Sequence, residues 1–556
     1  MAGKRSGGAI LVDQLAIQGV RRVFLVPGES YLPALDALYA HSNQIEAVVC
    51  RQEGGAAFMA EAHAKLTGEV GVCFVTRGPG ACNAAIGVHT AMQDSTPMVL
   101  LIGQVDRHMR YREAFQEIEV DSLYGWTTKW AAEVNDARRL PELLARAFRI
   151  ALSGRPGPVA LSLPEDMLND LVEVEDAAKV AALSAYPAPA LMVEMAERIL
   201  QAERPFLIVG GGGWTKQAAD DIRRFAAAWN LPTACSFRRQ DLVDNALEVY
   251  AGELGTSVDR RLIERIKQAD LVIAVGTRLS ELATQGYTLL EVPEPAVPLI
   301  HVHADLMELG RVYRPTLAIN AGVVEFAAAT TRLPVPATRW AGWTADCRGD
   351  YLASLQPDPC PGPLDMNAVV ETLQRRLPED VVLVNDAGNF SGWLQRFWCY
   401  RHYKSQLAPA NGAMGYAVPA AVAAAIELAD TRLVVCFVGD GGFMMTSQEL
   451  ATAVRHGAAP LIIVIDNASF GTIRMHQERK FPGRVVATDL ANPDFTALAA
   501  AYGAYGATVA ETAEFAPALE AALQAVASGR PALLTLKLSI EVISSRTTLS
   551  KMRETK

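Results

Sequence analysis

The sequence predicts an α/β fold of three doubly wound parallel-sheet domains. Short apolar runs rich in β-branched residues recur along the chain, which is typical of parallel strands buried on both faces. Stretches with a helical pattern separate these runs, as expected of βαβ units. Two Pro-rich stretches, "LSAYPAPA" at 183–190 and "LQPDPCPGP" at 355–363, divide the 556 residues into three blocks. A chain of this length exceeds what one hydrophobic core can organise.

The first block is expected to form a domain over residues 1–168. Its clearest strands are "VRRVFLVPG" at 20–28, "GVCFVTRGPG" at 71–80 and "TPMVLLIG" at 96–103. Each run is followed by glycine, proline or a polar residue, which marks the end of a strand.

The second block is expected to form a central, Rossmann-like domain over residues 190–335. Its strands are "RPFLIVGGGG" at 204–213, "ADLVIAVG" at 269–276 and "VPLIHVHAD" at 297–305. The glycines at 210–213 lack the third glycine of GxGxxG, because Thr215 stands at that position. They therefore favour a close strand-to-helix turn over a complete dinucleotide fingerprint.

The third block, over residues 361–556, contains "VVLVNDAGN" at 381–389, "LVVCFV" at 433–438 and "LIIVI" at 461–465. Between the last two strands, "TSQE" at 446–449 predicts a capping box that opens a helix, which "RHG" closes at Gly457. The order of strand, glycine loop, helix and Pro-led strand repeats that of "GVCFVTRGPGACNAAIGVHTAMQDSTPMVLLIG" in the first block. This echo suggests two copies of one architecture.

Asp440 and Asn467 follow successive strands of the third block, beside glycines. The carboxyl ends of parallel strands share the edge at which open α/β sheets bind ligands. Two oxygen donors beside a glycine-rich loop at a helix start suit Mg²⁺ carrying phosphate groups. The alternative is a tight turn in which Asp440 only caps a helix.

Composition narrows the partners and the compartment. The formal charge is −10 and the pI is about 5.5, with no dense Lys/Arg tract, so neither nucleic acid nor an anionic membrane is expected as a partner. The eight cysteines include no CxxC pair, which predicts reduced thiols in a cytoplasmic protein. No signal peptide or membrane-spanning run is expected. Half of the residues are hydrophobic, which favours a sizeable subunit interface.

Four segments together resemble the thiamine-diphosphate (ThDP) enzymes. They are "RQEGGAAFMAEAHAKLTG" at 51–68, "GPGACN" at 78–83, "NGAMGYAVPAA" at 411–421 and the stretch from Gly439 to Gly471. Within that superfamily the chain looks most like the acetolactate synthase (acetohydroxyacid synthase) large-subunit branch. The resemblance implies pyrimidine-binding, central and diphosphate-binding domains in that order.

The family signature is GDG followed, some two dozen residues later, by NN. Here 24 residues separate Gly441 from the pair Asp466-Asn467, so the first Asn is replaced by Asp. The resemblance implies that Asp440, Asn467 and the main-chain carbonyl of Ser469 bind Mg²⁺. Further cofactor-binding positions that it implies are Pro27, Gly28, Thr76, Asn83, Gly388, Asn389, Gly412, Met414, Gly441, Gly442, Phe470 and Gly471.

By the same resemblance, Glu53 shares a proton with the aminopyrimidine ring of ThDP and so promotes removal of the thiazolium proton. A carboxyl with this task is expected to be buried, with a raised pKa. Met414 would wedge the two rings into a bent shape, and the carbonyl of Gly412 would accept from the pyrimidine amine. Because Glu53 and the metal site fall in different domains, the family arrangement implies a homodimer or homotetramer with shared sites.

Three positions bear on the substrate. Glu29 stands where synthases usually carry Gly-Ala after Pro-Gly, and it is either an extra proton donor that would favour aldehyde release or a solvated loop carboxylate. Phe115 and Gln116 in "AFQE" match residues that border the substrate pocket of synthases. His476 replaces a Trp that selects the second oxoacid, so the preference for 2-oxobutyrate cannot be carried over.

The expected function is ThDP- and Mg²⁺-dependent decarboxylation of a pyruvate-like 2-oxoacid with carboligation to a second carbonyl. The alternatives are a 2-oxoacid decarboxylase that releases aldehyde, a ThDP-dependent carbon–carbon lyase, a ThDP-binding module, and a hydride-transferring oxidoreductase built on "GGGGW". FAD in the central block is left open, because "LSELAT" at 279–284 departs from the synthase flavin segment. The sequence does not decide on a regulatory subunit.

Overall fold

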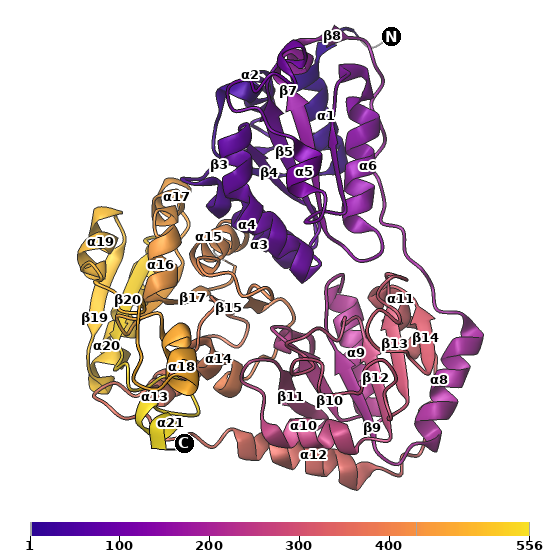
Figure 1. The fold of residues 1–556 in the computed structure, drawn as a ribbon, viewed down its shortest axis with the longest axis vertical. Coiled ribbons are helices and arrows are strands. Elements are labelled where there is room, and N and C mark those ends of the chain that lie inside the picture. Colours follow the sequence, from indigo (N-terminus) through magenta and orange to yellow (C-terminus); the bar gives the residue numbers. More distant parts are fainter. Residues whose placement is uncertain (1–2, 430, 555–556) are drawn as a thin grey trace. The chain divides into compact units, whose positions relative to one another are not determined.

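The computed structural model describes residues 3–429 and 431–554 (Figure 1). In these residues the strands form three parallel sheets of six strands each, flanked by helices, and one short antiparallel pair, β1 (Arg5–Ser6) with β8 (Leu171–Val172). The predicted fold class is confirmed. No helix in the described ranges is long and apolar enough to cross a membrane.

The N-terminal sheet has the strand order β3-β2-β4-β5-β7-β6. Its strands are β2 (Arg22–Leu25), β3 (Glu46–Val49), β4 (Gly71–Val75), β5 (Met98–Gln104), β6 (Trp130–Glu133) and β7 (Pro158–Pro164). Its helices are α1 (Gly7–Gln18), α2 (Leu32–Ala40), α3 (Glu53–Thr67), α4 (Gly78–Asp94), α5 (Val120–Tyr124), α6 (Leu140–Leu152) and α7 (Glu165–Asn169), with 3-10 turns η1 (Glu29–Tyr31), η2 (Arg107–Met109) and η3 (Ala137–Arg139).

The central sheet has the order β11-β10-β9-β12-β13-β14, which is the Rossmann order. Its strands are β9 (Pro205–Val209), β10 (Thr233–Ser236), β11 (Tyr250–Leu254), β12 (Leu271–Val275), β13 (Leu299–His303) and β14 (Leu317–Asn320). The accompanying helices are α8 (Pro189–Gln201), α9 (Lys216–Ala228), η4 (Gln240–Leu242), α10 (Arg260–Gln268), α11 (Val323–Thr330) and α12 (Ala341–Ser354).

The C-terminal sheet has the order β16-β15-β17-β18-β20-β19. Its strands are β15 (Val382–Asn385), β16 (Gln406–Leu407), β17 (Val434–Gly439), β18 (Leu461–Asp466), β19 (Tyr505–Val509) and β20 (Ala532–Lys537). The helices of this third of the chain are α13 (Met366–Arg376), α14 (Ser391–Phe397), α15 (Ala417–Leu428), α16 (Asp440–Thr446), α17 (Glu449–Arg455), α18 (Gly471–Lys480), α19 (Phe495–Ala501), α20 (Thr512–Ala527) and α21 (Leu549–Glu554).

The echo between the first and third blocks is a repeated topology. Numbered from its own first strand, each of the two sheets has the order 2-1-3-4-6-5. The order reverses between strands 1 and 3, so β2 and β4 flank the switch point of one sheet and β15 and β17 that of the other. Ligands of open α/β sheets bind at such points, at the carboxyl edge.

Buried apolar strands hold each sheet in place. All residues of β4, β5, β7 and β18 are buried, which explains their continuous apolar sequences. Helix ends follow local signals: the Ser6 side chain caps α1, which ends at Gly19 with φ 89°. The eight cysteines are free, as their spacing predicts.

The capping box predicted at Thr446–Glu449 is not formed. Helix α16 begins directly at Asp440 and ends at Thr446, and α17 begins at Glu449 without a side-chain cap. The Glu449 carboxylate instead accepts hydrogen bonds from the main chain of Arg51 and Gln52. The end of α17 agrees with the prediction, since Gly457 has φ 65°.

The chain forms two compact units. One contains the chain up to Leu183 together with Val418–Ala429 and Thr446–Ala458, and the other contains the rest of the described residues. Most of α15 and all of α17 therefore belong to the N-terminal unit, although they lie in the last third of the sequence.

Candidate functional site

A cavity of about 230 Å³ opens at the carboxyl edge of the C-terminal sheet. It lies at the switch point, because the loops after β15 and β17 both line it. The lining includes all the cofactor and metal positions predicted in the third block: Gly388, Asn389, Gly412, Met414, Asp440, Gly441, Gly442, Asn467, Ser469, Phe470 and Gly471. Residues 83 positions apart thus meet around one space.

The glycines in this cavity are required by close contacts. A Cβ on Gly441 would lie 2.6 Å from the Phe470 ring, and one on Gly442 would lie 2.5 Å from Oδ2 of Asp386. Gly388 has φ 150°, a backbone angle that residues with a side chain rarely adopt. A Cβ on Gly388 would also lie 2.4 Å from the Phe390 ring. Larger residues at these three positions would therefore clash with the side chains that shape the loops.

Asp440 and Asn467 supply side-chain oxygens to the cavity. Asp440 accepts from the Gly441 N–H at 2.8 Å and from Nδ2 of Asn492 at 2.8 Å, and its burial raises its pKa. Oδ1 of Asn467 accepts from the Ser469 N–H at 3.1 Å. One carboxylate, one amide oxygen and neighbouring main-chain carbonyls form a donor set that fits Mg²⁺, which completes its octahedron with phosphate and water oxygens.

Asp466 replaces the family Asn, and its negative charge is balanced by Lys537 at the end of β20. Oδ2 of Asp466 pairs with Nζ of Lys537, and Oδ1 accepts from Nδ2 of Asn492 at 2.8 Å. The amide of Asn492 thus bridges Asp466 and Asp440. Sequence reasoning identified neither Asn492 nor Lys537, because both lie far along the chain from the GDG segment.

Asp386 is a third residue that sequence reasoning did not identify. Its carboxylate is fully buried and accepts from the N–H groups of Ala387 and Gly415, each at 2.8 Å. Burial raises the pKa of Asp386 to about 6, against the effect of these hydrogen bonds. Because the carboxylate also fills the space beside Gly442, it joins the Met414–Gly415 loop to the GDG loop. The sequence "VNDAGN" held a signal, since an Asp ends an apolar strand there.

A second group of predicted residues lies at the switch point of the N-terminal sheet. Glu53 begins α3, and Nδ2 of Asn83 donates to its Oε2 at 2.9 Å. The Glu53 side chain is partly exposed in the single chain, rather than buried as expected. Gly28 packs against Thr76, with only 2.5 Å from the place of its Cβ to the Thr76 side chain. Pro27 is exposed beside it.

The substrate-related positions are mostly exposed. The Glu29 side chain is 67% exposed and pairs with Arg77 at 3.3 Å, while Arg77 also binds Glu165 at 2.8 Å. Phe115 is 75% exposed, and the carbonyl of Gln116 accepts from the Gly78 N–H at 2.9 Å. His476 is exposed on α18. Glu53 and Gln116 belong to one compact unit and His476 to the other.

After β9 the central sheet has a close strand-to-helix turn at residues 210–215. The loops after β9 and β12 touch, since a Cβ on Gly211 would lie 2.0 Å from the Gly276 carbonyl oxygen. The Trp214 indole donates to the Gly210 carbonyl at 2.8 Å. Residues 276–286, which contain "LSELAT", follow β12, and residues 301–311 include the end of β13 and the loop after it. FAD binding at this edge is left open, as it is by the sequence.

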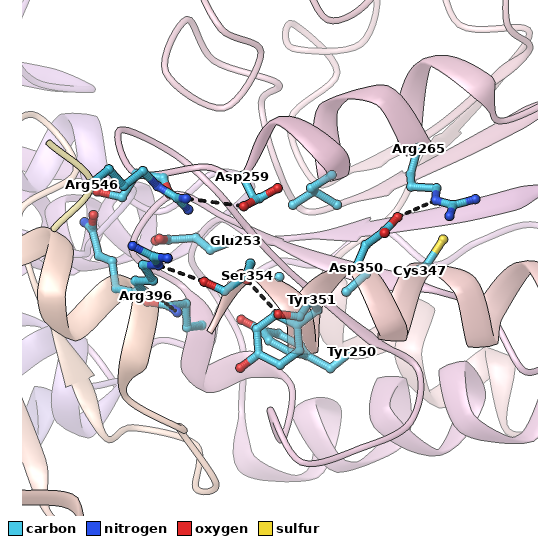
Figure 2. A pocket seen from close by; sticks show the side chains of 16 residues that line it. Tyr250, Glu253, Asp259, Arg265, Cys347, Asp350, Tyr351, Ser354, Arg396 and Arg546 are labelled. Carbon is cyan, nitrogen blue, oxygen red and sulfur yellow. Dashed lines mark hydrogen bonds and ion pairs between the residues drawn. The ribbon is translucent and has the colours of Figure 1, made fainter. Parts of the chain in front are cut away.

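A small cavity of about 30 Å³ lies beside β11 and α12 (Figure 2). Its charged residues bind one another or nearby main chain: Arg546 pairs with Asp259, Arg265 with Asp350, and Nε of Arg396 donates to the Ser354 carbonyl at 2.7 Å. Burial raises the pKa of Glu253 in its wall to about 8. Because its arginines are already bound, this cavity is structural packing and not the candidate site.

Comparison with known proteins agrees with this geometry. Three family models match: the thiamine pyrophosphate enzyme N-terminal TPP-binding domain over residues 5–123, the central domain over 192–330 and the C-terminal TPP-binding domain over 386–536. The chain belongs to the thiamine pyrophosphate enzymes, in the group that contains the acetolactate synthase large subunits.

Two relatives define that group for this chain. The acetolactate synthase isozyme 2 large subunit of Escherichia coli (strain K12) is 32% identical over 521 residues, which cover 93% of each chain. The acetolactate synthase large subunit of Parasynechococcus marenigrum (strain WH8102) is 32% identical over 541 residues, covering 93% of this chain and 86% of the relative. The resemblance stated from four motifs is confirmed over nearly the whole length.

Proposed function

We propose that this enzyme uses ThDP and Mg²⁺ to decarboxylate pyruvate or a similar 2-oxoacid and to join the acyl unit to a second carbonyl. This is the kind of reaction that the name of its relatives, acetolactate synthase, describes. The observation that supports this most is the convergence of Asp440, Asn467 and the glycine loops on one cavity of the sheet edge. When bound, ThDP supplies a carbon nucleophile and an electron sink. The residues of the chain bind and orient the cofactor and the substrate, and they transfer protons.

The cavity would hold the diphosphate end of the cofactor. Asp440, Asn467 and the carbonyl of Ser469 would bind the metal, and the amides of the Gly388 and Gly441 loops would receive the phosphate oxygens. Met414 lies partly buried in the wall of the same cavity and would support the rings.

Glu53 would hold the proton that the aminopyrimidine exchanges. It starts α3 and its Oε2 accepts from Asn83, so its carboxylate is fixed at the sheet edge of the N-terminal unit. Its partial exposure in one chain supports the proposal that a second copy covers it, in a homodimer or homotetramer that shares its sites. We also propose the domain limits 1–168, 190–335 and 361–556.

Product analysis by NMR tests this function directly. Purified protein is incubated with pyruvate, ThDP and Mg²⁺, and the expected main product is acetolactate. Acetaldehyde as the main product would overturn carboligation and direct attention to Glu29. Unchanged pyruvate would show that pyruvate is not the substrate. The absorption spectrum of the same preparation reports bound flavin, and sedimentation reports the oligomeric state.

A further inference from the structure

The buried carboxylate of Glu449 lies against the start of α3. Its Oε1 accepts from the N–H groups of Arg51 and Gln52, each at 3.1 Å, and its Oε2 accepts from Arg51 at 3.2 Å. Oγ1 of Thr452 donates to the same Oε2 at 2.6 Å. Glu449 is fully buried, and Glu449, Arg51 and Gln52 belong to the same compact unit.

These two amides immediately precede Glu53. The N–H groups at the start of a helix have no partner within the helix, and the helix dipole favours a negative charge there. The Gln52 side chain accepts a hydrogen bond from the Gly55 N–H at 3.0 Å. The Glu449 carboxylate accepts from the N–H groups of Arg51 and Gln52. The main chain that carries Glu53 is therefore fixed on both sides of this residue.

Gly55 makes room for the carboxylate. A Cβ at this position would lie 2.5 Å from Oε1 of Glu449 and 2.9 Å from its Cδ, and the three closest atoms all belong to Glu449. Its φ is not in the left-handed region, so the absence of a side chain, rather than the backbone, is what this glycine provides. Gly55 and Glu449 thus fit each other.

The rest of α17 holds the strand that leads to Glu53. Nε2 of His456 accepts from the Val49 N–H at 3.3 Å. Nδ1 of His456 lies 3.2 Å from Oε1 of Glu46. Because β3 is an edge strand, this contact binds a main-chain N–H that the sheet leaves unpaired.

We propose that Glu449 is a positioning residue for Glu53: it fixes the first turn of α3 so that the Glu53 carboxylate keeps the orientation needed for proton transfer. This inference rests on the proposed function of Glu53. Glu449 is not among the residues that line the cavity; it acts through the main chain of Arg51 and Gln52. A displacement of ~1 Å at a reacting group can lower a rate about 100-fold.

The test measures hydrogen–deuterium exchange at the thiazolium C2 of ThDP, by NMR after acid quench, in the Mg²⁺-loaded holoenzyme. Glu449→Ala is expected to slow exchange about 10- to 100-fold, with the Kd of ThDP changed little and the Tm of the holoenzyme lowered, because the main-chain N–H groups of Arg51 and Gln52 lose their acceptor. Glu449→Gln is expected to keep most of the rate, because its amide oxygen can accept from both N–H groups. Exchange at the wild-type rate in Glu449→Ala would overturn the inference.

Glu427→Ala is the matched control. Glu427 also comes from the last third of the chain and pairs with Arg22 and with His63 in the same unit. Its loss is expected to lower the Tm and leave exchange unchanged. If Glu427→Ala slows exchange as much as Glu449→Ala, the effect is general loosening of the unit and the inference is wrong.

Two further variants separate the possible failures. Glu53→Gln is measured in parallel: if it exchanges normally, the proposed role of Glu53 fails, whereas loss in Glu53→Gln with none in Glu449→Ala refutes only the role of Glu449. If Glu449→Ala does not fold, Gly55→Ala displaces the carboxylate without removing it. Gly55→Ala is expected to slow exchange in the wild-type background, and normal exchange in a folded Gly55→Ala protein would overturn the inference.

Discussion

The N-terminal and C-terminal sheets have the same strand order, but different residues follow their strands at the carboxyl edge. After the third strand of each, the N-terminal sheet continues into Thr76 and Arg77, whereas the C-terminal sheet continues into Asp440. After the first strand, Val26 stands in one sheet and the buried Asp386 in the other. The shared topology therefore provides the position of a site, and the loop residues decide which ligand group it can take.

The difference separates two kinds of chemistry. The C-terminal edge offers glycine loops and oxygen ligands, which suit an anion with a divalent cation. The N-terminal edge offers a carboxylate at a helix start, held by Asn83, which suits proton exchange. Variants at each edge should therefore affect separate properties, binding in one case and proton transfer in the other.

The largest expected effect is at the N-terminal edge. Glu53→Gln removes the exchangeable proton but keeps the shape, so C2 exchange should fall by about 10²- to 10⁴-fold, as for other acid–base groups. The Kd of ThDP should change by less than a factor of about 3, because the phosphate-binding loops are untouched. A large loss of ThDP binding would show that the two edges are not functionally separate.

At the C-terminal edge, Asp440→Ala is expected to weaken Mg²⁺ and ThDP binding about 100-fold, since it removes the only charged side chain among the proposed ligands. Titration calorimetry with ThDP at fixed Mg²⁺ measures this loss. Glu53→Gln, at the edge of the other sheet, is the control and should keep metal affinity. Equal losses in both variants would contradict the division of roles.

Asp386 should make the stability of the cofactor-free protein depend on pH. Burial raises its pKa to about 6 in the folded chain from the ordinary value of 3.8, so the folded state holds the proton more tightly. Stability from this group is present below pH 4 and is lost as the pH rises through about 6. The loss is of order 1–3 kcal/mol. Chemical denaturation at pH 4 and pH 7 measures it, and Asp386→Asn should abolish this part of the slope.

The smallest effect concerns the Asp that replaces the family Asn. Lys537→Met leaves Asp466 without its cation and should disturb the Asn492 bridge to Asp440, weakening Mg²⁺ binding about tenfold. The double variant Asp466→Asn with Lys537→Met removes both charges and should recover most of the affinity. If the double variant binds no better than Lys537→Met, Lys537 does not act by neutralising Asp466.

Much of the fold could be predicted because buried parallel strands are continuous apolar runs. β4, β9, β12 and β15 lie within runs identified in the sequence, and β17 and β18 extend only one residue beyond theirs. The edge strand β3 was missed because most of its residues are partly exposed and carry little apolar signal. The edge strand β16 was missed because it has only two residues, Gln406 and Leu407.

The candidate site could be predicted only where its residues lie in a motif. Asp440, Asn467 and Met414 belong to local patterns, and the structure places all three around one cavity. Asn492, Lys537 and Glu449 act over long sequence separations, so no local pattern identifies their partners. The capping box predicted at Glu449 is an example: a helix does begin there, but the Glu449 carboxylate binds Arg51 and Gln52, which lie 398 and 397 residues earlier in the chain.

Most of α15 and all of α17 belong to the N-terminal unit, and this limits where the chain can be cut into fragments. A fragment ending at Leu183 would keep all the strands of its sheet but lose Glu427 and His456, leaving Arg22 without one of its ion-pair partners and the edge of β3 open. Open edge strands pair with other chains and aggregate. Exchange of whole domains between relatives would therefore succeed only if residues 418–429 and 446–458 travelled with the N-terminal domain, although they lie more than two hundred residues away in the gene product.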